Sequence, residues 1–199
     1  MKLKILQTGE KVLRQAARVL TANEIRGAEI QQLIELMRET MRDAPGVGLA
    51  APQVGVPFQV AVVEDREEYL KDITAEVLAE RGRRPVPFQV IINPAIRLSG
   101  VQAEFFEGCL SVAGFCALVP RASRVHVEAL NERAEPVVID AEGWHARILQ
   151  HEIDHLQGAL YVDRMRARSF TTNENLSRYW KNKSMDEVRA ELGVARERG

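Results

Sequence analysis

The sequence is poor in cysteine and has no long apolar run. Cys109 and Cys116 are the only cysteines among the 199 residues, and two thiols so close together do not supply a disulfide framework. No stretch approaches the roughly 20 apolar residues that span a bilayer, and the first nine residues lack the apolar centre of a signal peptide. These absences predict a cytoplasmic protein that does not contact a membrane.

An excess of charge of either sign is also missing. Lysine and arginine number 27 and aspartate and glutamate 28, so the formal net charge is -1. Without a basic excess to bind phosphate groups, we expect no direct contact with nucleic acid. Hydrophobic residues make up 46% and charged residues 28% of the chain, which is typical of one globular domain with a substantial core.

Helical patterns open the chain. A short one covers 10–19, and a longer apolar series predicts a surface helix that ends before Pro45. Thr21 and Glu24 have the spacing of a capping box at the start of this series. The small residues that follow, at 46–55, let a backbone approach a ligand closely, but they form neither a P-loop nor a dinucleotide fingerprint. Alone, this stretch indicates only a tight structural turn.

Strands are predicted at 58–63, 88–92, 95–98, 125–130 and 137–141. The charged stretch 65–84 is expected to form an exposed loop or helical insertion whose charges are solvated. A second capping box at Ser184 and Glu187 predicts a short helix toward Leu192. Because the strands precede one key helix without alternating β and α segments, the sequence predicts an α+β fold with antiparallel or mixed sheets.

The most informative stretch is a His-Glu-x-x-His sequence. Apolar residues at three- and four-residue spacings predict a helix over 144–157, with Gly158 in the position of a C-terminal cap. On this helix His151 and His155 share one face and could bind one metal ion, with Glu152 beside them as a carboxylate base. The alternative is a pair of surface histidines with an unrelated glutamate.

The other two histidines are expected to be peripheral. His145 lies six residues before His151, which places it off the ligand face and at the surface of the helix. His126 alternates with valines in a half-buried strand and is expected to point outward. Neither residue is expected to bind the metal.

Two histidines leave a catalytic metal ion one ligand short, since such sites take three protein ligands and keep one open position. Cys109 lies in the turn-prone stretch 107–114 and could supply a thiolate, although a buried structural cysteine is an equal alternative. A metallopeptidase would share the helix, yet its third ligand usually lies downstream and no histidine follows His155. A metal-stabilised interaction domain without enzymatic activity is another alternative.

Three segments together resemble the peptide deformylase family. The family pattern is a Gly-x-Gly-Leu-Ala-Ala-Pro-Gln loop, a Glu-Gly-Cys-Leu-Ser strand and a Gln-His-Glu-x-Asp-His-Leu helix, which stand here in that order at 46–53, 107–111 and 150–156. The similarity runs from about Leu6 through Arg164. It implies sheets around a central metal-binding helix, with a catalytic part over 1–165 and a polar, helical extension of the same domain over 166–199.

The resemblance also implies a role for individual residues. The metal ligands would be Cys109, His151 and His155, and the general acid/base would be Glu152. The oxyanion hole would consist of Gln53 and the backbone N–H of Leu110, and the backbone along the substrate would be that of Val47, Gly48 and Gly108. We further hypothesise that Trp144 and Ile148 line an apolar methionine pocket. Outside these groups, Glu107 would orient a ligand imidazole and Asp154 would pair with an arginine such as Arg121.

The implied reaction removes the formyl group from N-formyl-methionyl nascent polypeptides and releases formate. A water on the metal would be the nucleophile, and Glu152 would take its proton and return it to the departing amine. One divalent ion is expected, ferrous iron in the cell, although a site with a thiolate ligand also suits zinc, nickel or cobalt. The protein is expected to be a monomer or a homodimer.

The chain also departs from the pattern of many bacterial relatives. They carry proline at the position of Ala113 and arginine at that of Cys116, whereas 111–115 and 143–144 look more like the organellar branch. Any substrate contact that relatives make through that arginine is therefore in doubt here. We expect a bacterial cytoplasmic enzyme, with a mature organellar form as the alternative.

Overall fold

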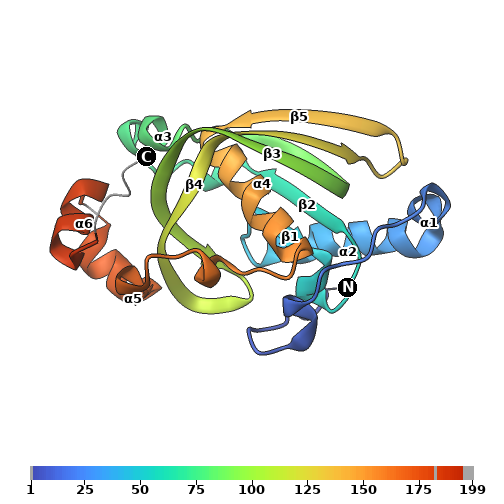
Figure 1. The fold of residues 1–199 in the computed structure, drawn as a ribbon, viewed down its shortest axis with the longest axis horizontal. Helices are drawn as coiled ribbons and strands as arrows, with labels where there is room; N and C mark the ends of the chain where they lie inside the picture. The colour runs from blue at the N-terminus through green and yellow to red at the C-terminus, as the bar shows by residue number, and fades with distance from the viewer. Residues whose placement is uncertain (1, 182, 195–199) are drawn as a thin grey trace.

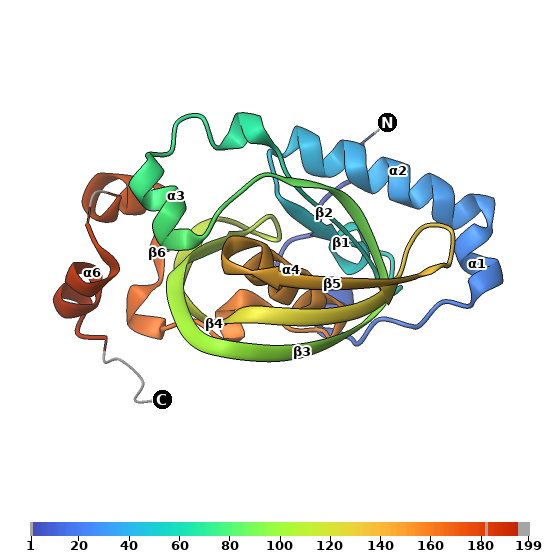
Figure 2. The ribbon, with the colours of Figure 1, turned by 90° about the horizontal axis from the view of Figure 1, so that it is seen from above.

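A computed structural model, which describes residues 2–181 and 183–194, shows a curved sheet wrapped around one central helix (Figures 1 and 2). The strands are β1 Gly48–Ala50, β2 Val60–Asp65, β3 Val86–Cys109, β4 Val112–Leu130, β5 Pro136–Glu142 and β6 Thr171–Thr172. The strand order is β1-β2-β3-β4-β5, with β6 on β4, and every pairing between these strands is antiparallel. The predicted α+β class is confirmed.

Six α-helices and several shorter turns accompany the sheet. The helices are α1 Ala22–Arg26, α2 Ala28–Asp43, α3 Ala75–Arg81, α4 Gly143–Leu156, α5 Asn173–Asn175 and α6 Met185–Leu192, with 3₁₀ turns at Lys11–Arg14, Ala51–Val54, Glu67–Tyr69, Tyr161–Asp163 and Ala167–Ser169 and a π-helical turn at Leu176–Trp180. Among the described residues, no helix has both the length and the apolar character needed to cross a membrane.

The N-terminal helices differ from the prediction. The pattern at 10–19 forms only the 3₁₀ turn, because the chain then becomes extended and the Ala17 N–H donates to the Leu156 carbonyl at 2.8 Å. The capping box of Thr21 and Glu24 is confirmed. The helix that it opens, however, stops at Gly27, whose extended backbone (ψ 149°) separates α1 from α2.

The two strands predicted at 88–92 and 95–98 are parts of the single long strand β3. Its pairing with β4 shifts register between Ile92 and Ala95 and again between Ser99 and Gln102. Such bulges bend a strand and interrupt its alternation of apolar and polar residues. The alternation therefore stops near Asn93 and Pro94, although the strand continues. The bends carry β3 and β4 around α4 (Figure 2).

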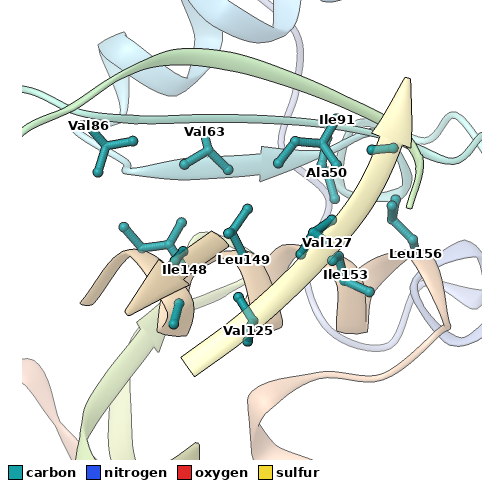
Figure 3. Packing of buried hydrophobic residues seen from close by; sticks show 14 of the residues in the cluster. Ala50, Val63, Val86, Ile91, Val125, Val127, Ile148, Leu149, Ile153 and Leu156 are labelled. Atoms are coloured by element: carbon teal, nitrogen blue, oxygen red, sulfur yellow. The ribbon is translucent and has the colours of Figure 1, made fainter. Parts of the chain in front are cut away.

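Helix α4 fills the space inside this curve. Its apolar residues pack on two sides, against β1, β2 and the start of β3, and against β4 (Figure 3); the labelled members are Ile148, Leu149, Ile153, Leu156, Ala50, Val63, Val86, Ile91, Val125 and Val127. The helix ends as predicted before Gly158, which has φ +77° and leaves no room for a side chain, since a Cβ would lie 2.8 Å from the Arg14 carbonyl carbon. The His-Glu-x-x-His sequence is thus on a largely buried helix.

The charged stretch 65–84 forms a 3₁₀ turn and α3, as predicted, but its charges are not all solvated. The Asp65 side chain is fully buried and accepts two hydrogen bonds from Arg83, at 2.7 and 2.9 Å. At the other end of the chain α6 forms near its predicted position. It contacts β3 through an ion pair between Arg189 and Glu104 at 3.3 Å.

Candidate metal and catalytic site

Helix α4 and the end of β3 bring three donor side chains together. The ligand atoms of Cys109, His151 and His155 all lie within 4.8 Å of one another, and Cys109 Sγ is 3.3 Å from His155 Nε2. Cys109 belongs to β3 itself rather than to the expected turn, which is limited to the two residues before β4. One thiolate and two imidazoles fit a divalent transition metal with a fourth position open.

Glu107 fixes the orientation of one histidine. Its Oε2 is 3.1 Å from His151 Nδ1, which leaves His151 Nε2 free to face the other donors. Burial alone would raise the pKa of Glu107, but the hydrogen bond with His151 and the charge of Arg121 outweigh it and lower the pKa. The carboxylate is therefore ionised, and the predicted contact between Glu107 and a histidine is confirmed.

Glu107 also belongs to a buried network of ion pairs beneath the site. Arg121 donates two hydrogen bonds to Glu107, both at 3.0 Å, and one to Asp154 at 2.5 Å, which confirms the predicted Arg121–Asp154 pair. Arg147 donates to Glu107 at 2.5 Å. Arg147 was not predicted to belong to the site, although its position four residues before His151 places both on one face of the helix.

Glu152 points into the space in front of the donors. Its side chain is buried, and Oε2 has no hydrogen-bond partner among the described residues. Burial raises the pKa of Glu152 to about 7, a value suited to moving protons near neutral pH. Gly48 makes this position possible, because a Cβ there would lie 2.2 Å from Glu152 Oε1.

Gln53 is held by hydrogen bonds at both ends of its amide. Its Oε1 accepts from the backbone N–H of Ala50 at 2.8 Å. Its Nε2 lies 3.2 Å from Ser111 Oγ and 3.5 Å from Cys109 Sγ. The amide donor is therefore fixed beside the Cys109 sulfur. Leu110, the next residue after Cys109, is anchored through its carbonyl, which accepts from the Gln7 side chain at 3.0 Å.

A cavity of about 490 Å³ opens in front of these residues. Every predicted site residue lines it except His155, which is buried behind Cys109; the lining members of that set are Val47, Gly48, Gln53, Gly108, Cys109, Leu110, Trp144, Ile148, His151 and Glu152. Arg83, Phe115 and Asn173 are among the other lining residues, and none of the three was predicted to belong to the site. Arg83 lies in the charged stretch 65–84, Phe115 lies at the register shift between Gly108 and Cys109, and Asn173 lies in the C-terminal extension. No local sequence pattern shows that these segments reach the cavity.

Trp144 is supported from behind by cationic and aromatic side chains. The guanidinium of Arg81 lies 5.2 Å from its ring centroid, and the ring of Phe105 meets it edge-on at 6.2 Å. Arg83 and Arg147 lie over the same ring at 5.4 and 5.7 Å. The apolar wall of the cavity is therefore fixed by contacts with α3 and β3.

The remaining predicted residues lie away from the donors. His145 is partly exposed and its Nε2 is 3.1 Å from Gln89 Oε1, away from the donor group, as predicted. His126 is partly exposed and its Nδ1 is 2.7 Å from the Asp140 carboxylate. Both cysteines are free. Cys116 is buried and does not line the cavity, and burial raises the pKa of its thiol to about 11.

Comparisons with known proteins agree with this geometry. The sequence model of the polypeptide deformylase family matches residues 2–170. Peptide deformylase 3 of Streptomyces avermitilis is 44% identical over 194 residues, which cover 97% of this chain and 84% of that protein. The chloroplastic peptide deformylase 1A of Solanum lycopersicum is 47% identical over 86% of this chain, which spans only 62% of that protein.

Solved structures give the same result. A class I type b peptide deformylase from Acinetobacter baumannii, crystallised with Met-Ala-Ser bound, has a TM-score of 0.74 and 34% identity, and the match covers 83% of this chain and 99% of that one. The chain therefore belongs to the polypeptide deformylase family, hydrolases that remove the N-formyl group from nascent polypeptides.

Proposed function

We propose that this chain hydrolyses the N-formyl group of N-formyl-methionyl nascent polypeptides and releases formate, with one divalent ion held by Cys109, His151 and His155. The observation that carries the proposal is the convergence of these three donors, within 4.8 Å of one another, beside the buried carboxylate of Glu152. A divalent ion in this position lowers the pKa of a water molecule and polarises a carbonyl oxygen. All other steps belong to the protein.

Glu152 is the general acid/base. Its unpartnered Oε2 accepts a proton from the attacking water and returns it to the amine that leaves. The absence of a side chain at Gly48 leaves room for Oε1 of this carboxylate. Burial raises the pKa of Glu152 to about 7, so the group can both accept and return a proton near neutral pH.

Negative charge that develops on the formyl oxygen is met by fixed donors. Gln53 Nε2 and the backbone N–H of Leu110 form this oxyanion hole, and donors of this kind are each worth roughly 10²–10³ in rate. The Gln53 amide cannot rotate freely, because Ala50 and Ser111 bond to its two ends. The donor is therefore in place before the reaction begins.

The rest of the cavity binds the peptide. The backbone of Val47, Gly48 and Gly108 lines its extended chain, and Trp144 and Ile148 form the apolar wall for the methionine side chain. The Met-Ala-Ser peptide bound by the Acinetobacter relative supports a ligand that continues beyond methionine. We place the catalytic unit in 1–165 and its extension in 166–199.

The mixed sulfur and nitrogen donors favour a borderline or soft divalent ion. We propose ferrous iron in the cell, with zinc, nickel or cobalt as ions that the same donors accept. We also propose that the enzyme acts in the cytoplasm on chains leaving the ribosome, as a monomer or a homodimer.

Formate release from a formyl-methionyl peptide tests the proposal. Cys109→Ala should lower the metal content and kcat together, because it removes one of three ligands. Cys116→Ala is the matched control and should retain both, since that thiol is buried away from the cavity. Elemental analysis that finds full metal in Cys109→Ala, or cleavage of an unformylated peptide without formate release, would contradict the assignment.

A further inference from the structure

The chain returns to the catalytic cavity just after the residues matched by the family model, which end at 170. Backbone and side-chain hydrogen bonds hold this returning segment against β4. The Arg166 N–H donates to the Leu118 carbonyl, and the Leu118 N–H donates to Ser169 Oγ, both at 2.8 Å. The two residues of β6 then pair with Phe115 and Cys116. The segment is fixed in place like a sheet strand.

This pairing puts two side chains at the open end of the cavity. Phe115 from β4 and Asn173 from the start of α5 both line it. Phe170 stacks on Phe115, with ring centroids 5.1 Å apart and planes within 7°. The two aromatic residues are nevertheless 40% and 42% exposed. The Asn173 carbonyl accepts from the Leu176 N–H, but within the described residues its side-chain amide makes no hydrogen bond. Phe115, with Phe170 stacked on its ring, and the side-chain amide of Asn173 therefore face the cavity together.

The stacked rings are within reach of a bound peptide. Phe115 adjoins Cys116, which pairs directly with Gly108, the residue before the ligand Cys109. An extended peptide advances about 3.3 Å per residue. Trp144, Phe115 and Asn173 line the same cavity, so a peptide whose methionine lies against Trp144 can continue along this cavity toward Phe115 and Asn173.

We propose that Phe115, Phe170 and Asn173 form a subsite for the second and third residues of the formylated peptide. The stacked rings favour an apolar or aromatic side chain there, and the Asn173 amide hydrogen-bonds to the peptide backbone. This inference rests on the proposed deformylase function. The subsite uses the C-terminal extension, so it gives that segment a role in choosing among nascent chains.

Steady-state kinetics of the metal-loaded full chain test the subsite with two substrates. One is formyl-methioninamide, which ends before the subsite, and the other is formyl-Met-Leu-Phe, which fills it. For Phe170→Ala and Asn173→Ala we expect the ratio of kcat/KM for the long substrate to that for the short one to fall about 3- to 10-fold. The loss should appear in KM. Tyr179→Ala, an equally exposed aromatic residue of the same extension that does not line the cavity, should keep the wild-type ratio.

The outcomes separate this inference from the function on which it rests. Formate release by the wild type with an unchanged ratio in both variants would overturn the subsite alone. An equal loss on both substrates would also overturn it, because a general structural defect does not distinguish peptide length. Absence of formate release by the metal-loaded wild type from either substrate would overturn the proposed function and the subsite together.

Discussion

Glu107 is the residue on which the buried charges of the site depend. Its carboxylate faces His151, Arg121 and Arg147, and the side chains of Glu107 and both arginines are at most 5% exposed. Burial alone would lower the pKa of Arg121, but Glu107 and Asp154 raise it, so the guanidinium stays charged. A buried network of this kind is stable only when each charge is compensated.

Glu107→Gln should therefore destabilise the protein and weaken metal binding. The neutral amide leaves the buried Arg147 guanidinium without a counter-charge and Arg121 with Asp154 alone, and breaking a buried pair in this way costs about 3–5 kcal/mol. It also weakens the anchor of His151, which should lower metal affinity about 10- to 100-fold. Thermal unfolding and metal titration measure the two effects. Glu128→Gln, which removes the charge from an exposed ion pair with Arg97, is the control and should change neither by much.

Glu152→Ala should separate metal binding from catalysis. The three donors remain, so the metal content should stay at the wild-type level. The loss of a positioned acid/base should lower kcat by roughly 10²–10⁴. Formate production and elemental analysis of the same preparation check both parts. A variant that keeps its metal and releases formate near the wild-type rate would show that another group moves the proton.

At the scale of elements, local patterns predicted some parts of the fold much better than others. The helix predicted over 144–157 forms at Gly143–Leu156, because its apolar spacing and terminal glycine are local signals. Strand β3 was predicted as two strands, because its bulges interrupt the alternation of apolar and polar residues. Helices α1 and α2 were predicted as one helix, because the presence of Gly27 does not show whether the backbone turns there.

The predictability of the site follows the same rule. Cavity residues within the three motif segments, such as Glu152 and Gln53, were predicted because they are part of the motif sequences. Phe115 and Asn173 were not, since they meet only after β6 pairs with β4. Asp65 was expected in solvent because charged stretches usually are. Its burial depends on Arg83, a partner 18 residues away.

The capping box of α1 provides a pH-dependent test at this scale. Hydrogen bonds from Arg18 and from Thr21 lower the pKa of Glu24 to about 2, from 4.5. A lowered folded-state pKa means that the carboxylate stabilises the fold above about pH 4.5 and loses this effect as pH falls toward 2. Glu24→Gln should therefore lower the Tm at pH 7, and its difference from the wild type should shrink below pH 4.5. A difference that does not depend on pH would contradict this assignment.

For the whole molecule, α4 serves as both core and site. The same helix carries the apolar residues that pack on the sheet (Figure 3) and both histidines of the donor group. The proposed metal ligands come from α4 and the end of β3, and the proposed oxyanion donor Gln53 comes from the turn after β1. Curvature of the sheet around the helix is therefore what brings distant segments of the sequence into one site.

Leu149→Ala should show that core packing and the site are lost together. Leu149 is fully buried on α4, and removing such a side chain costs about 2–5 kcal/mol, or a decrease in Tm of roughly 4–20 °C for a domain of this size. Activity after heating should disappear at the same lowered temperature, because the histidines keep their places only while α4 is packed. Leu98→Ala, on β3 but 59% exposed, is the matched control and should shift neither curve by more than about 2 °C. Activity lost well below the unfolding transition of Leu149→Ala would mean instead that the site melts before the core.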